Sequence, residues 1–182
     1  MTEYIPIHYV CTNKDARKMI FAHDRFWVSN CGCREGNKDG CKRSRIDVCL
    51  SFRGDIGSSG SGLREIPLTE VVAILDEASE KKLVTRPFRG EKDRSVTEGI
   101  CFCCNDCCGY ILNREERCDK GTQIESTDME LCNLCGDCVQ ACYFGARKMV
   151  DDKLVVSRDE CYGCGMCVEA CSLEAISLGA RK

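Results

Sequence analysis

The feature that most constrains this chain is a run of cysteines that occurs twice toward its carboxyl end. The stretch "CNLCGDCVQACYFGARKMV" (residues 132–150) aligns with "CYGCGMCVEACSLEAISLG" (residues 161–179), and each of its cysteines recurs 29 positions later. Both stretches have the spacing C-x2-C-x2-C-x3-C. The connection "RKMVDDKLVVS" has two short β-type segments around an Asp-Asp turn, which predicts a hairpin. Each half is therefore expected to contain a cysteine loop, a short helix and a strand.

Four cysteines with this spacing suit a [4Fe-4S] cluster better than a single metal ion. A tight loop can direct three successive thiolates at three iron atoms, and the fourth thiolate then comes from elsewhere in the chain. Structural zinc instead uses two C-x2-C pairs, separated by a dozen or more residues, to close one tetrahedron. Two complete triplets, each followed by a single cysteine, do not fit that zinc pattern.

Residues 128–182 resemble the bacterial-type ferredoxins that carry two [4Fe-4S] clusters, because both four-cysteine runs are complete. In that family the fourth cysteine of each run ligates the other cluster. The resemblance therefore implies two cross-tied ligand sets: Cys132, Cys135, Cys138 and Cys171 for one cluster, and Cys161, Cys164, Cys167 and Cys142 for the other. The chain departs from the family at Tyr143 and Ser172, where a proline usually follows. That proline shapes the helix exit and does not bind iron.

A second concentration of cysteines precedes the repeat, in "GICFCCNDCCGY" at residues 99–110. It contains Cys101, Cys103, Cys104, Cys107 and Cys108. Cys101, Cys104 and Cys107 have the triplet spacing of the repeat, which predicts at least one further iron–sulfur cluster. The fourth thiolate would come from an upstream segment that offers Cys31, Cys33, Cys41 and Cys49.

The sequence equally allows a second assignment, in which the amino-terminal cysteines form two separate sites. The four upstream cysteines would then form one site, and four of the five clustered cysteines another. Adjacent cysteines are poor ligands for one small ion, because neighbouring side chains diverge, but they suit larger or bridged clusters. A zinc site, a reversible dithiol and buried unligated thiols are the alternatives to an iron–sulfur centre.

The upstream motifs carry a looser resemblance. A C-x-C motif, an isolated Gly-Cys, "VCLSF" and a cysteine cluster ahead of a ferredoxin domain resemble an iron–sulfur protein type of anaerobes, of unknown function. The cluster of that type is still richer in cysteine, and Asp106 stands where another is expected. The resemblance implies an anaerobic iron–sulfur protein and no particular reaction.

Composition and charge narrow the class of protein. The 19 cysteines in 182 residues are typical of disulfide scaffolds or metal proteins. Their odd number, and an amino terminus "MTEYIPIHYV" without secretory features, favour metal-bound thiols in the cytoplasm. A formal charge of −3, with both signs mixed along the chain, argues against nucleic-acid binding. Apolar runs fall short of the roughly 18 residues that a membrane span requires.

We predict an α+β chain with two domains. Residues 1–122 would form a small mixed α/β, cysteine-rich metal-binding domain with a flexible glycine- and serine-rich loop at about 53–65. Within it, "PLTEVVAILDEASEKKLV" has an apolar helical face. "YIPIHYVCT" reads as a strand, and "DARKMIFAHDRFWV" has a weaker helical pattern. Residues 123–182 would form the ferredoxin module, with βαβ-like halves related by a pseudo-twofold axis.

The ferredoxin resemblance implies low-potential, one-electron transfer, which requires no acid, base or nucleophile. We therefore predict no catalytic residue and a polyferredoxin-like protein that passes electrons between the ferredoxin module and a partner redox enzyme through the amino-terminal centre. The alternative is a reductase whose amino-terminal cysteine-ligated cluster is the active site, marked by an open iron position or a dithiol. A redox partner protein is expected in either case, and the sequence leaves a homo-oligomer open.

Overall fold

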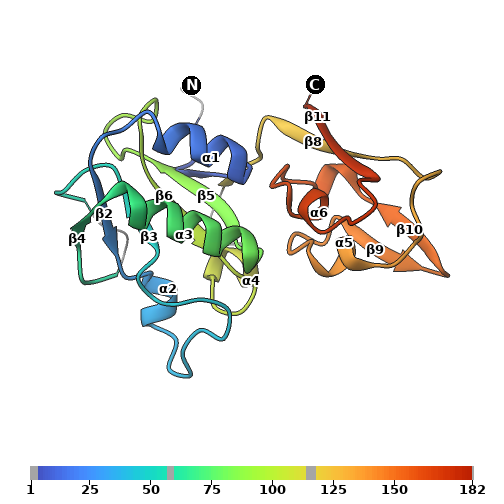
Figure 1. Ribbon diagram of the computed structural model, residues 1–182, viewed down its shortest axis with the longest axis horizontal. Coiled ribbons are helices and arrows are strands. Elements are labelled where there is room, and N and C mark those ends of the chain that lie inside the picture. Colours follow the sequence, from blue (N-terminus) through green and yellow to red (C-terminus); the bar gives the residue numbers. More distant parts are fainter. Residues whose placement is uncertain (1–3, 57–59, 114–117, 182) are drawn as a thin grey trace.

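The computed structural model describes residues 4–56, 60–113 and 118–181, which fold into two lobes (Figure 1). The amino-terminal lobe holds a seven-stranded sheet, and the carboxy-terminal lobe holds two sheets of two strands each. The architecture is mixed α/β, as predicted. Within the predicted flexible loop at 53–65, residues 57–59 lie outside the described residues. After them, Ser61 donates its backbone N–H to Glu35 Oε2 at 2.9 Å, so this end of the loop is anchored.

The large sheet has the strand order β4-β2-β3-β6-β5-β1-β7. Its strands are β1 (His8–Tyr9), β2 (Phe26–Ser29), β3 (Cys49–Ser51), β4 (Arg64–Ile66), β5 (Val84–Arg89), β6 (Thr97–Cys103) and β7 (Cys118–Asp119). Neighbouring strands are antiparallel except for the parallel pair of β1 and β7. Strand β6 lies at the centre of the order, so its side chains are flanked on both sides by paired strands.

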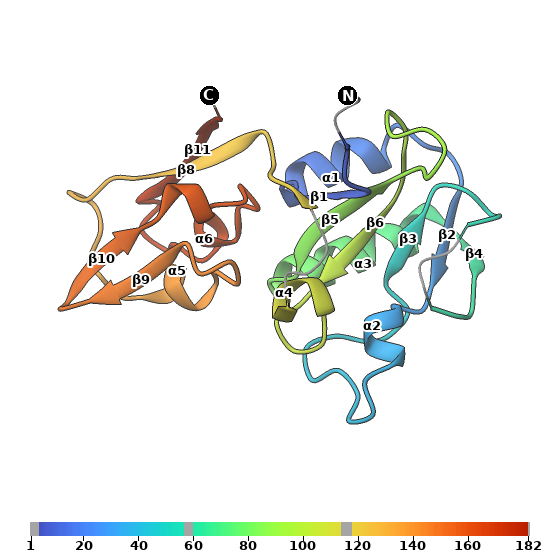
Figure 2. The same ribbon diagram turned by 180° about the vertical axis from the view of Figure 1, so that it is seen from behind.

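Helices cover one face of this sheet. They are α1 (Asn13–Ile20) and α3 (Leu68–Glu80), which Figures 1 and 2 show from opposite sides of the sheet, while α2 (Gly32–Glu35) and α4 (Gly109–Asn113) lie at its lower edge. In α3, Val71, Ile74, Leu75 and Ala78 are buried at helical spacing, which confirms the predicted helix. No helix in the described part of the chain is long and apolar enough to cross a bilayer.

The helical pattern predicted from Asp15 onward is only partly right. Helix α1 begins at Asn13, with Thr12 as its N-cap, and ends at Ile20. Phe26 to Ser29 form strand β2 instead, because aromatic and β-branched residues there pair with β3 on one side and β4 on the other. Pairing with a strand on each side outweighs the weak helical spacing of this segment.

The alternation of side chains along β6 separates two buried clusters. Ile100 and Phe102 join the core beneath α1 and α3, and so does Cys104 just past the strand. Cys101 and Cys103 belong to the other cluster. Successive strand residues point to opposite faces of a sheet, so adjacent cysteines are delivered to different environments.

The carboxy-terminal lobe repeats the order loop, helix, strand. Its elements are β8 (Gln123–Thr127), α5 (Asp137–Gln140), β9 (Arg147–Val150), β10 (Lys153–Val156), the 3₁₀ turn η1 (Arg158–Glu160), α6 (Met166–Glu169) and β11 (Ile176–Ala180). Strand β9 pairs with β10, and β8 pairs with β11, both antiparallel. The predicted hairpin is confirmed: Asp151 and Asp152 have φ of 48° and 58°, as a two-residue hairpin turn requires.

The two lobes share a buried cluster, called the junction cluster here. Its buried members are Val10, Val84, Cys103, Cys108, Tyr110, Ile111, Ala141, Phe144 and Met166. The Phe144 and Tyr162 rings stack at 4.2 Å, and the Tyr110 ring contacts both from the amino-terminal lobe. Asn13 and Ser79 both donate to the carboxylate of Glu169 across the same boundary. The lobes therefore pack through an aromatic core with a polar rim.

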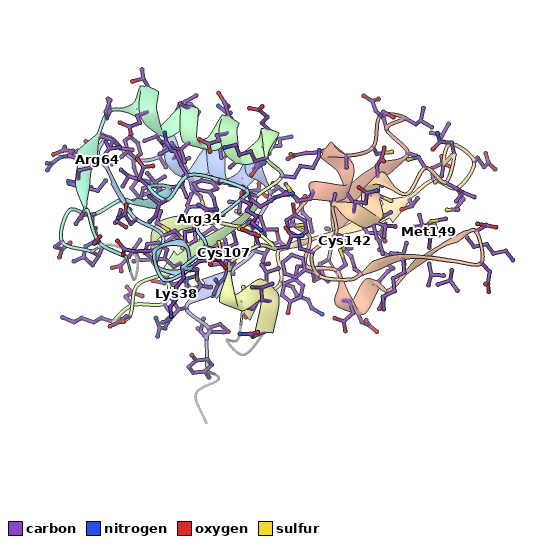
Figure 3. All side chains as sticks on the ribbon, turned by 90° about the horizontal axis from the view of Figure 1, so that it is seen from below. Arg34, Lys38, Arg64, Cys107, Cys142 and Met149 are labelled. Atoms are coloured by element: carbon purple, nitrogen blue, oxygen red, sulfur yellow. The ribbon has the colours of Figure 1, made fainter. Side chains whose placement is uncertain are left out.

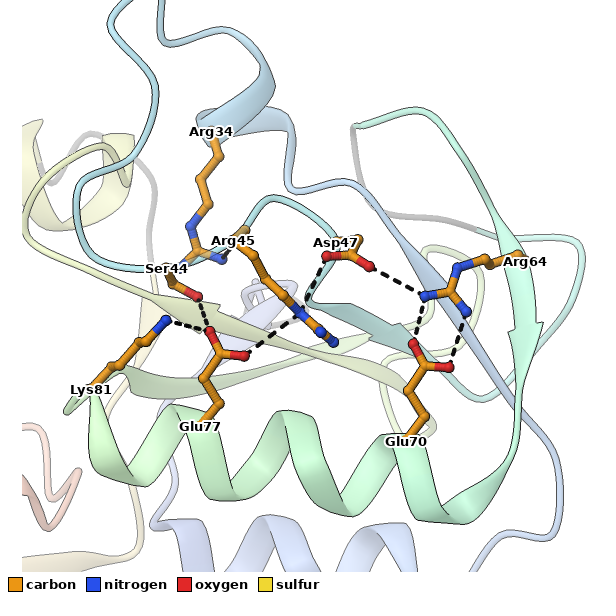
Figure 4. A network of polar contacts seen from close by, with 8 residues as sticks. All are labelled: Arg34, Ser44, Arg45, Asp47, Arg64, Glu70, Glu77 and Lys81. Carbon is orange, nitrogen blue, oxygen red and sulfur yellow. Dashed lines mark hydrogen bonds and ion pairs between the residues drawn. The ribbon is translucent and has the colours of Figure 1, made fainter.

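An ion-pair network holds the long loop between α2 and β3 against helix α3 (Figure 4). Glu77 accepts hydrogen bonds from Ser44 at 3.1 Å and Lys81 at 2.7 Å, and it pairs with Arg45 at 3.6 Å. Toward the start of the helix, Arg64 bridges Asp47 at 3.2 Å and Glu70. The loop has no helix or strand between residues 36 and 48, so these side chains supply its anchorage.

Replacing Glu77 with alanine should loosen that loop. The change removes the acceptor that Ser44, Arg45 and Lys81 share, and we expect the free energy of unfolding to fall by about 1 kcal/mol, because the two charged partners, Arg45 and Lys81, are partly exposed. Trypsin should also cleave faster at Lys42. The control is Glu80→Ala, an exposed position near the end of the same helix. Equal unfolding and cleavage in the two variants would contradict the anchoring role.

Candidate metal centres

The eight cysteines of the repeat line two cavities in the carboxy-terminal lobe. The first cavity is lined by Cys132, Cys135, Cys138 and Cys171. The second is lined by Cys142, Cys161, Cys164 and Cys167. Each cavity combines three cysteines of one run with the last cysteine of the other, and these are the sets that the ferredoxin resemblance implies. Their ligation of iron stays a prediction.

Left-handed backbone positions shape the two cysteine loops. Gly136 and Gly165, which precede α5 and α6, have φ of 84° and 83°. Gly163 has φ of 71°, and a Cβ there would lie 2.1 Å from the carbonyl oxygen of Gln123. Any side chain at residue 163 would push the second cysteine loop away from strand β8, so glycine is required there.

A buried ion pair lies between the two cavities. Arg147 pairs with Glu125, and only 1% and 5% of their side chains are exposed. Arg147 lines the second cavity, and it donates to the sulfur of Cys138, a residue of the first cavity, at 3.3 Å. Burial lowers the pKa of Arg147, but the nearby charges of Cys167 and Cys138 raise it, and the net shift is upward. One guanidinium therefore interacts with both ligand sets.

The amino-terminal lobe has a cavity of about 400 Å³ at the end of the large sheet. Eight cysteines line it: Cys31, Cys33, Cys49, Cys101, Cys103, Cys104, Cys107 and Cys108. They come from α2, β3, β6 and the turn before α4. Cys41, the remaining predicted ligand, lies behind Cys104, with 3.7 Å between the two sulfurs. The structure thus brings all nine predicted amino-terminal ligands to one region.

The sulfurs fall into two groups. In the three-cysteine group, Cys41, Cys104 and Cys107 have all sulfurs within 4.8 Å of one another. In the five-cysteine group, contacts run from Cys49 to Cys31, Cys33, Cys108 and Cys103. The structure therefore brings Cys41, and not Cys101, to the C-x2-C pair of Cys104 and Cys107. Cys101 lines the cavity from strand β6.

Hydrogen bonds inside the five-cysteine group favour the thiolate at Cys33 and Cys103 and the protonated thiol at Cys31 and Cys108, whose pKa values they raise. The bond from Cys108 is the largest cause that lowers the pKa of Cys33, and it also lowers the pKa of Cys103. Arg86 lowers the pKa of Cys103 further, since its Nη1 lies 3.9 Å from the sulfur. Thiolates are the form that binds metal, so Cys33 and Cys103 are the members of this group whose surroundings favour ligation most directly.

Two buried arginines flank the cavity. Arg34 is 3% exposed and donates to the backbone carbonyls of Arg45 and Phe102 at 3.0 and 2.9 Å. Burial lowers its pKa, while the charges of Cys31, Cys104 and Cys41 raise it to a higher net value. Arg86 is 5% exposed, and its guanidinium lies 4.3 Å over the ring of Tyr110. Buried cations require nearby anions, and cysteine sulfurs that can ionise lie next to both arginines.

The junction cluster links the metal-ligand candidates of both lobes. Cys142 and Cys164 pack against it from the second carboxy-terminal cavity, and it contains Cys103 and Cys108. Figure 3 shows Cys107 and Cys142 in the two lobes on either side of this region, with Met149 near the far end of the carboxy-terminal lobe. The amino-terminal cysteines therefore approach the second repeat set and not the first.

Tyr143 stands between the two lobes, at a position where ferredoxins usually have proline. Its hydroxyl accepts a hydrogen bond from Arg43, and the same guanidinium lies 5.6 Å from its ring. Burial raises the pKa of Tyr143, Arg43 lowers it, and the charges of Cys104 and Cys164 raise it further. The phenol is thus close enough to one cysteine of each lobe to interact with both.

The sequence did not point to Arg34, Arg86, Arg147 or Glu125, and it marked Tyr143 only as a departure from the proline of the family. A usable signal was present for two of them, because Arg86 interrupts "LVTRPF" and Glu125 interrupts "QIEST", both in β-type runs. The basic residues that follow Cys41 anchor their own loop: Arg43 donates to the carbonyl oxygen of Lys81 at 2.8 Å, and Arg45 pairs with Asp47 and Glu77.

Residues 124–172 match the family model described as a 4Fe-4S dicluster domain, and this segment includes every cysteine of the repeat. A sequence search of curated proteins found no match to the chain. The dicluster match agrees with the paired cysteine cavities of the carboxy-terminal lobe. This lobe is therefore similar to ferredoxin-type domains, and the similarity supports iron–sulfur clusters and iron–sulfur electron transfer as its chemistry.

Proposed function

We propose that this chain is a low-potential electron-transfer protein in which the carboxy-terminal lobe exchanges electrons with an amino-terminal iron–sulfur centre. The observation that carries the proposal is the junction cluster. It holds Cys103 and Cys108 of the five-cysteine group in the same buried unit against which Cys142 and Cys164 pack. An electron path between two sets of cysteine ligands requires that they approach each other through buried protein, as they do at this cluster.

The repeat cysteines would hold two [4Fe-4S] clusters in the sets that share each cavity, as a pseudo-twofold module within residues 123–182. A further iron–sulfur centre would be held by cysteines of the five-cysteine group. When bound, these clusters supply one-electron transfer and no acid–base chemistry. The remaining steps of the proposal concern what the side chains of this chain do around them.

Buried cations lower the cost of adding an electron. Arg147 contacts Cys138 and lies near Cys167, while Arg86 contacts Cys103. A positive charge held at a thiolate stabilises the more negative, reduced state and raises the reduction potential of that centre. Glu125 partly offsets Arg147, so the ion pair sets an intermediate local charge.

The aromatic side chains at the junction exclude water. Phe144 and Tyr110 are buried, and Tyr162 stacks on Phe144. Electrostatic interactions strengthen where water is excluded, so the arginine–thiolate contacts gain importance at this boundary. The aromatic core also fixes the distance between the lobes, which would otherwise vary with rigid-body motion.

A redox partner would approach the opposite end of the carboxy-terminal lobe. The first cavity is lined by the exposed Cys135, and exposed apolar side chains surround its loop. These are Met129, Leu131, Leu134 and Leu173. Exposed apolar side chains around a cofactor are typical of transient docking surfaces. Electrons would enter there and leave through the amino-terminal lobe, or pass in the reverse direction.

A reductase is the second candidate, and the two buried arginines that line the cysteine-rich cavity, Arg34 and Arg86, favour it. The amino-terminal cluster would fill part of this cavity, because its ligands line it. In the reductase, the five-cysteine group would hold the reacting centre, and a small substrate would enter beside Arg34 and Arg86. Substrate-dependent oxidation of the prereduced protein would favour this candidate over the carrier.

The cross-tied ligand sets can be tested with serine variants. Cys171→Ser should lose the same EPR signal as Cys132→Ser, and not the signal lost in Cys161→Ser, because Cys171 shares a cavity with Cys132. The measurement is reduced-state EPR, with iron and sulfide counts, of protein purified without oxygen. Cys11→Ser, a buried thiol outside the three cysteine-lined cavities, is the control. Matching spectra for Cys171→Ser and Cys161→Ser would overturn the cross-tied arrangement.

Replacing Arg147 with glutamine should lower the reduction potentials of the carboxy-terminal clusters. The variant removes a buried positive charge and leaves Glu125 unpaired, so we expect a shift of about 60 mV, a tenfold change in equilibrium constant for one electron. Pairing the change with Glu125→Gln should recover part of the shift. Potentiometric EPR measures both, and Arg158→Gln, an exposed arginine of the same lobe, is the control. Unchanged potentials in Arg147→Gln would refute the tuning role.

Electron transfer across the junction is the direct test of the proposed function. After flash photoreduction, the amino-terminal centre should become reduced quickly in the native protein and much more slowly in Cys161→Ser, which lacks a ligand of the second carboxy-terminal set. Freeze-quench EPR follows each centre over time. Equal rates in both proteins would show that the amino-terminal centre does not receive electrons through the carboxy-terminal lobe.

A further inference from the structure

The three-cysteine group has the geometry of a site for one metal ion. The Cys41 and Cys104 sulfurs are 3.7 Å apart, the Cys104 and Cys107 sulfurs are 3.4 Å apart, and all three lie within 4.8 Å. Tetrahedral thiolate coordination with metal–sulfur bonds of about 2.3 Å separates the sulfurs by about 3.8 Å. We propose that Cys41, Cys104 and Cys107 bind a single thiophilic divalent ion, zinc or iron, in addition to the iron–sulfur centres.

The other cysteines of the chain provide an internal comparison. Among the described residues, this is the one group of three or more Cys, His, Asp or Glu side chains whose ligand atoms converge within 4.8 Å. The two repeat sets share cavities but do not meet that limit. Wider spacing suits a polynuclear cluster, in which each sulfur binds a different iron, and close spacing suits one ion.

Backbone contacts hold the site together independently of any metal. The N–H of Lys42 donates to Asp106 Oδ2 at 2.8 Å, which ties the Cys41 loop to the turn that carries Cys104 and Cys107. Arg43 and Ser44 then fasten the same loop to α3 through the Lys81 carbonyl oxygen and Glu77. The cysteines are therefore positioned by contacts that do not involve their sulfurs, as a preorganised metal site requires.

The charge of Arg34 fits a mononuclear site. Arg34 is buried against this group; it donates to the carbonyl oxygens of Arg45 and Phe102 and also interacts with the Cys104 sulfur. The charges of Cys104 and Cys41 act on it directly. Three thiolates and one divalent cation leave a single net negative charge, which one guanidinium balances. A buried cation without such an anion would be strongly unfavourable.

The three-cysteine group is separate from the five-cysteine group, although two of its cysteines are sequence neighbours of cysteines in the other group. Cys104 belongs to the core beneath α1 and α3, with Cys41 and Cys107 packed against that core. Cys103 and Cys108 belong to the junction cluster. Each Cys-Cys pair therefore sends one sulfur to each side, so the two groups can bind different metals.

The fourth position of the ion would face the cavity. Cys104 and Cys107 line the cavity of about 400 Å³, whereas Cys41 lies behind them. No fourth Cys, His, Asp or Glu side chain of the described residues completes the group. Three protein ligands with a fourth position open to a cavity are typical of reactive metal sites, and closed four-ligand sites are structural. Water or an exogenous thiolate would take that position.

Adjacent cysteines provide matched variants for the test. In protein purified without oxygen, Cys104→Ser should lose one zinc or iron ion per chain, with acid-labile sulfide unchanged. Its neighbour Cys103→Ser should instead lower iron and sulfide together. Elemental analysis identifies the metal, and EPR of the carboxy-terminal clusters in the same samples reports the proposed electron-transfer module separately. Loss of sulfide in Cys104→Ser would overturn the mononuclear site without affecting that module.

Cys41→Ser and cobalt substitution keep the proposal testable if the buried Cys104→Ser variant does not fold. Cys41 lies in a surface loop, so Cys41→Ser is expected to stay folded and to lose the same ion. In native protein depleted of zinc, added Co²⁺ should give the visible absorption of tetrahedral thiolate coordination, and Cys41→Ser should not. A small thiol such as β-mercaptoethanol should shift these bands by taking the fourth position. Absent cobalt bands, or full metal content in Cys41→Ser, would refute the proposal.

Discussion

Three buried arginines each lie against cysteine sulfur, and the rest of the structure depends on those contacts. Arg34, Arg86 and Arg147 are 3%, 5% and 2% exposed. Burial of a guanidinium costs several kcal/mol unless an anion compensates it, and Arg147 has the buried carboxylate of Glu125 beside it. Thiolates at the neighbouring cysteines would supply that compensation. Metal binding keeps thiols deprotonated at neutral pH, so metal loading would stabilise the folded state of this chain.

Metal binding that stabilises the folded state would explain how a sheet with short strands can be stable. Five of the seven strands in the large sheet have four residues or fewer, and the loop from α2 to β3 has no regular structure. This loop is held by Glu77 of α3, which accepts a hydrogen bond from Ser44, and by the contact between the Cys41 and Cys104 sulfurs. A metal ion bound there would replace the hydrogen-bonded strands that such a loop lacks, and it would join the loop to the centre of the sheet.

Much of the carboxy-terminal lobe could be predicted from sequence, because its elements are determined by residues that are close together in the chain. The repeat fixes the order loop, helix, strand, and the Asp-Asp turn of the β9–β10 hairpin follows from two residues. The amino-terminal site could not be resolved in the same way. Cys41 and Cys104 are 63 residues apart, and their contact depends on the antiparallel register of β3 and β6 and on the Lys42–Asp106 hydrogen bond. Cys101, Cys104 and Cys107 have the triplet spacing, but side chains alternate along β6, so Cys101 lies against the junction cluster and not beside Cys104 and Cys107.

The same alternation gives a physical reason for the adjacent cysteine pairs. A strand end followed by a tight turn presents consecutive side chains to opposite sides, so "CC" supplies one ligand to each of two sites at no cost in chain length. Cys103 and Cys108 then face the aromatic junction, while Cys104 and Cys107 face the loop that carries Cys41. The short segment from Cys103 to Cys108 can thereby set the separation between two metal sites through covalent geometry alone. Asp106 fits this arrangement, since a carboxylate there binds the Lys42 backbone and closes the turn, which a further thiol would do only weakly.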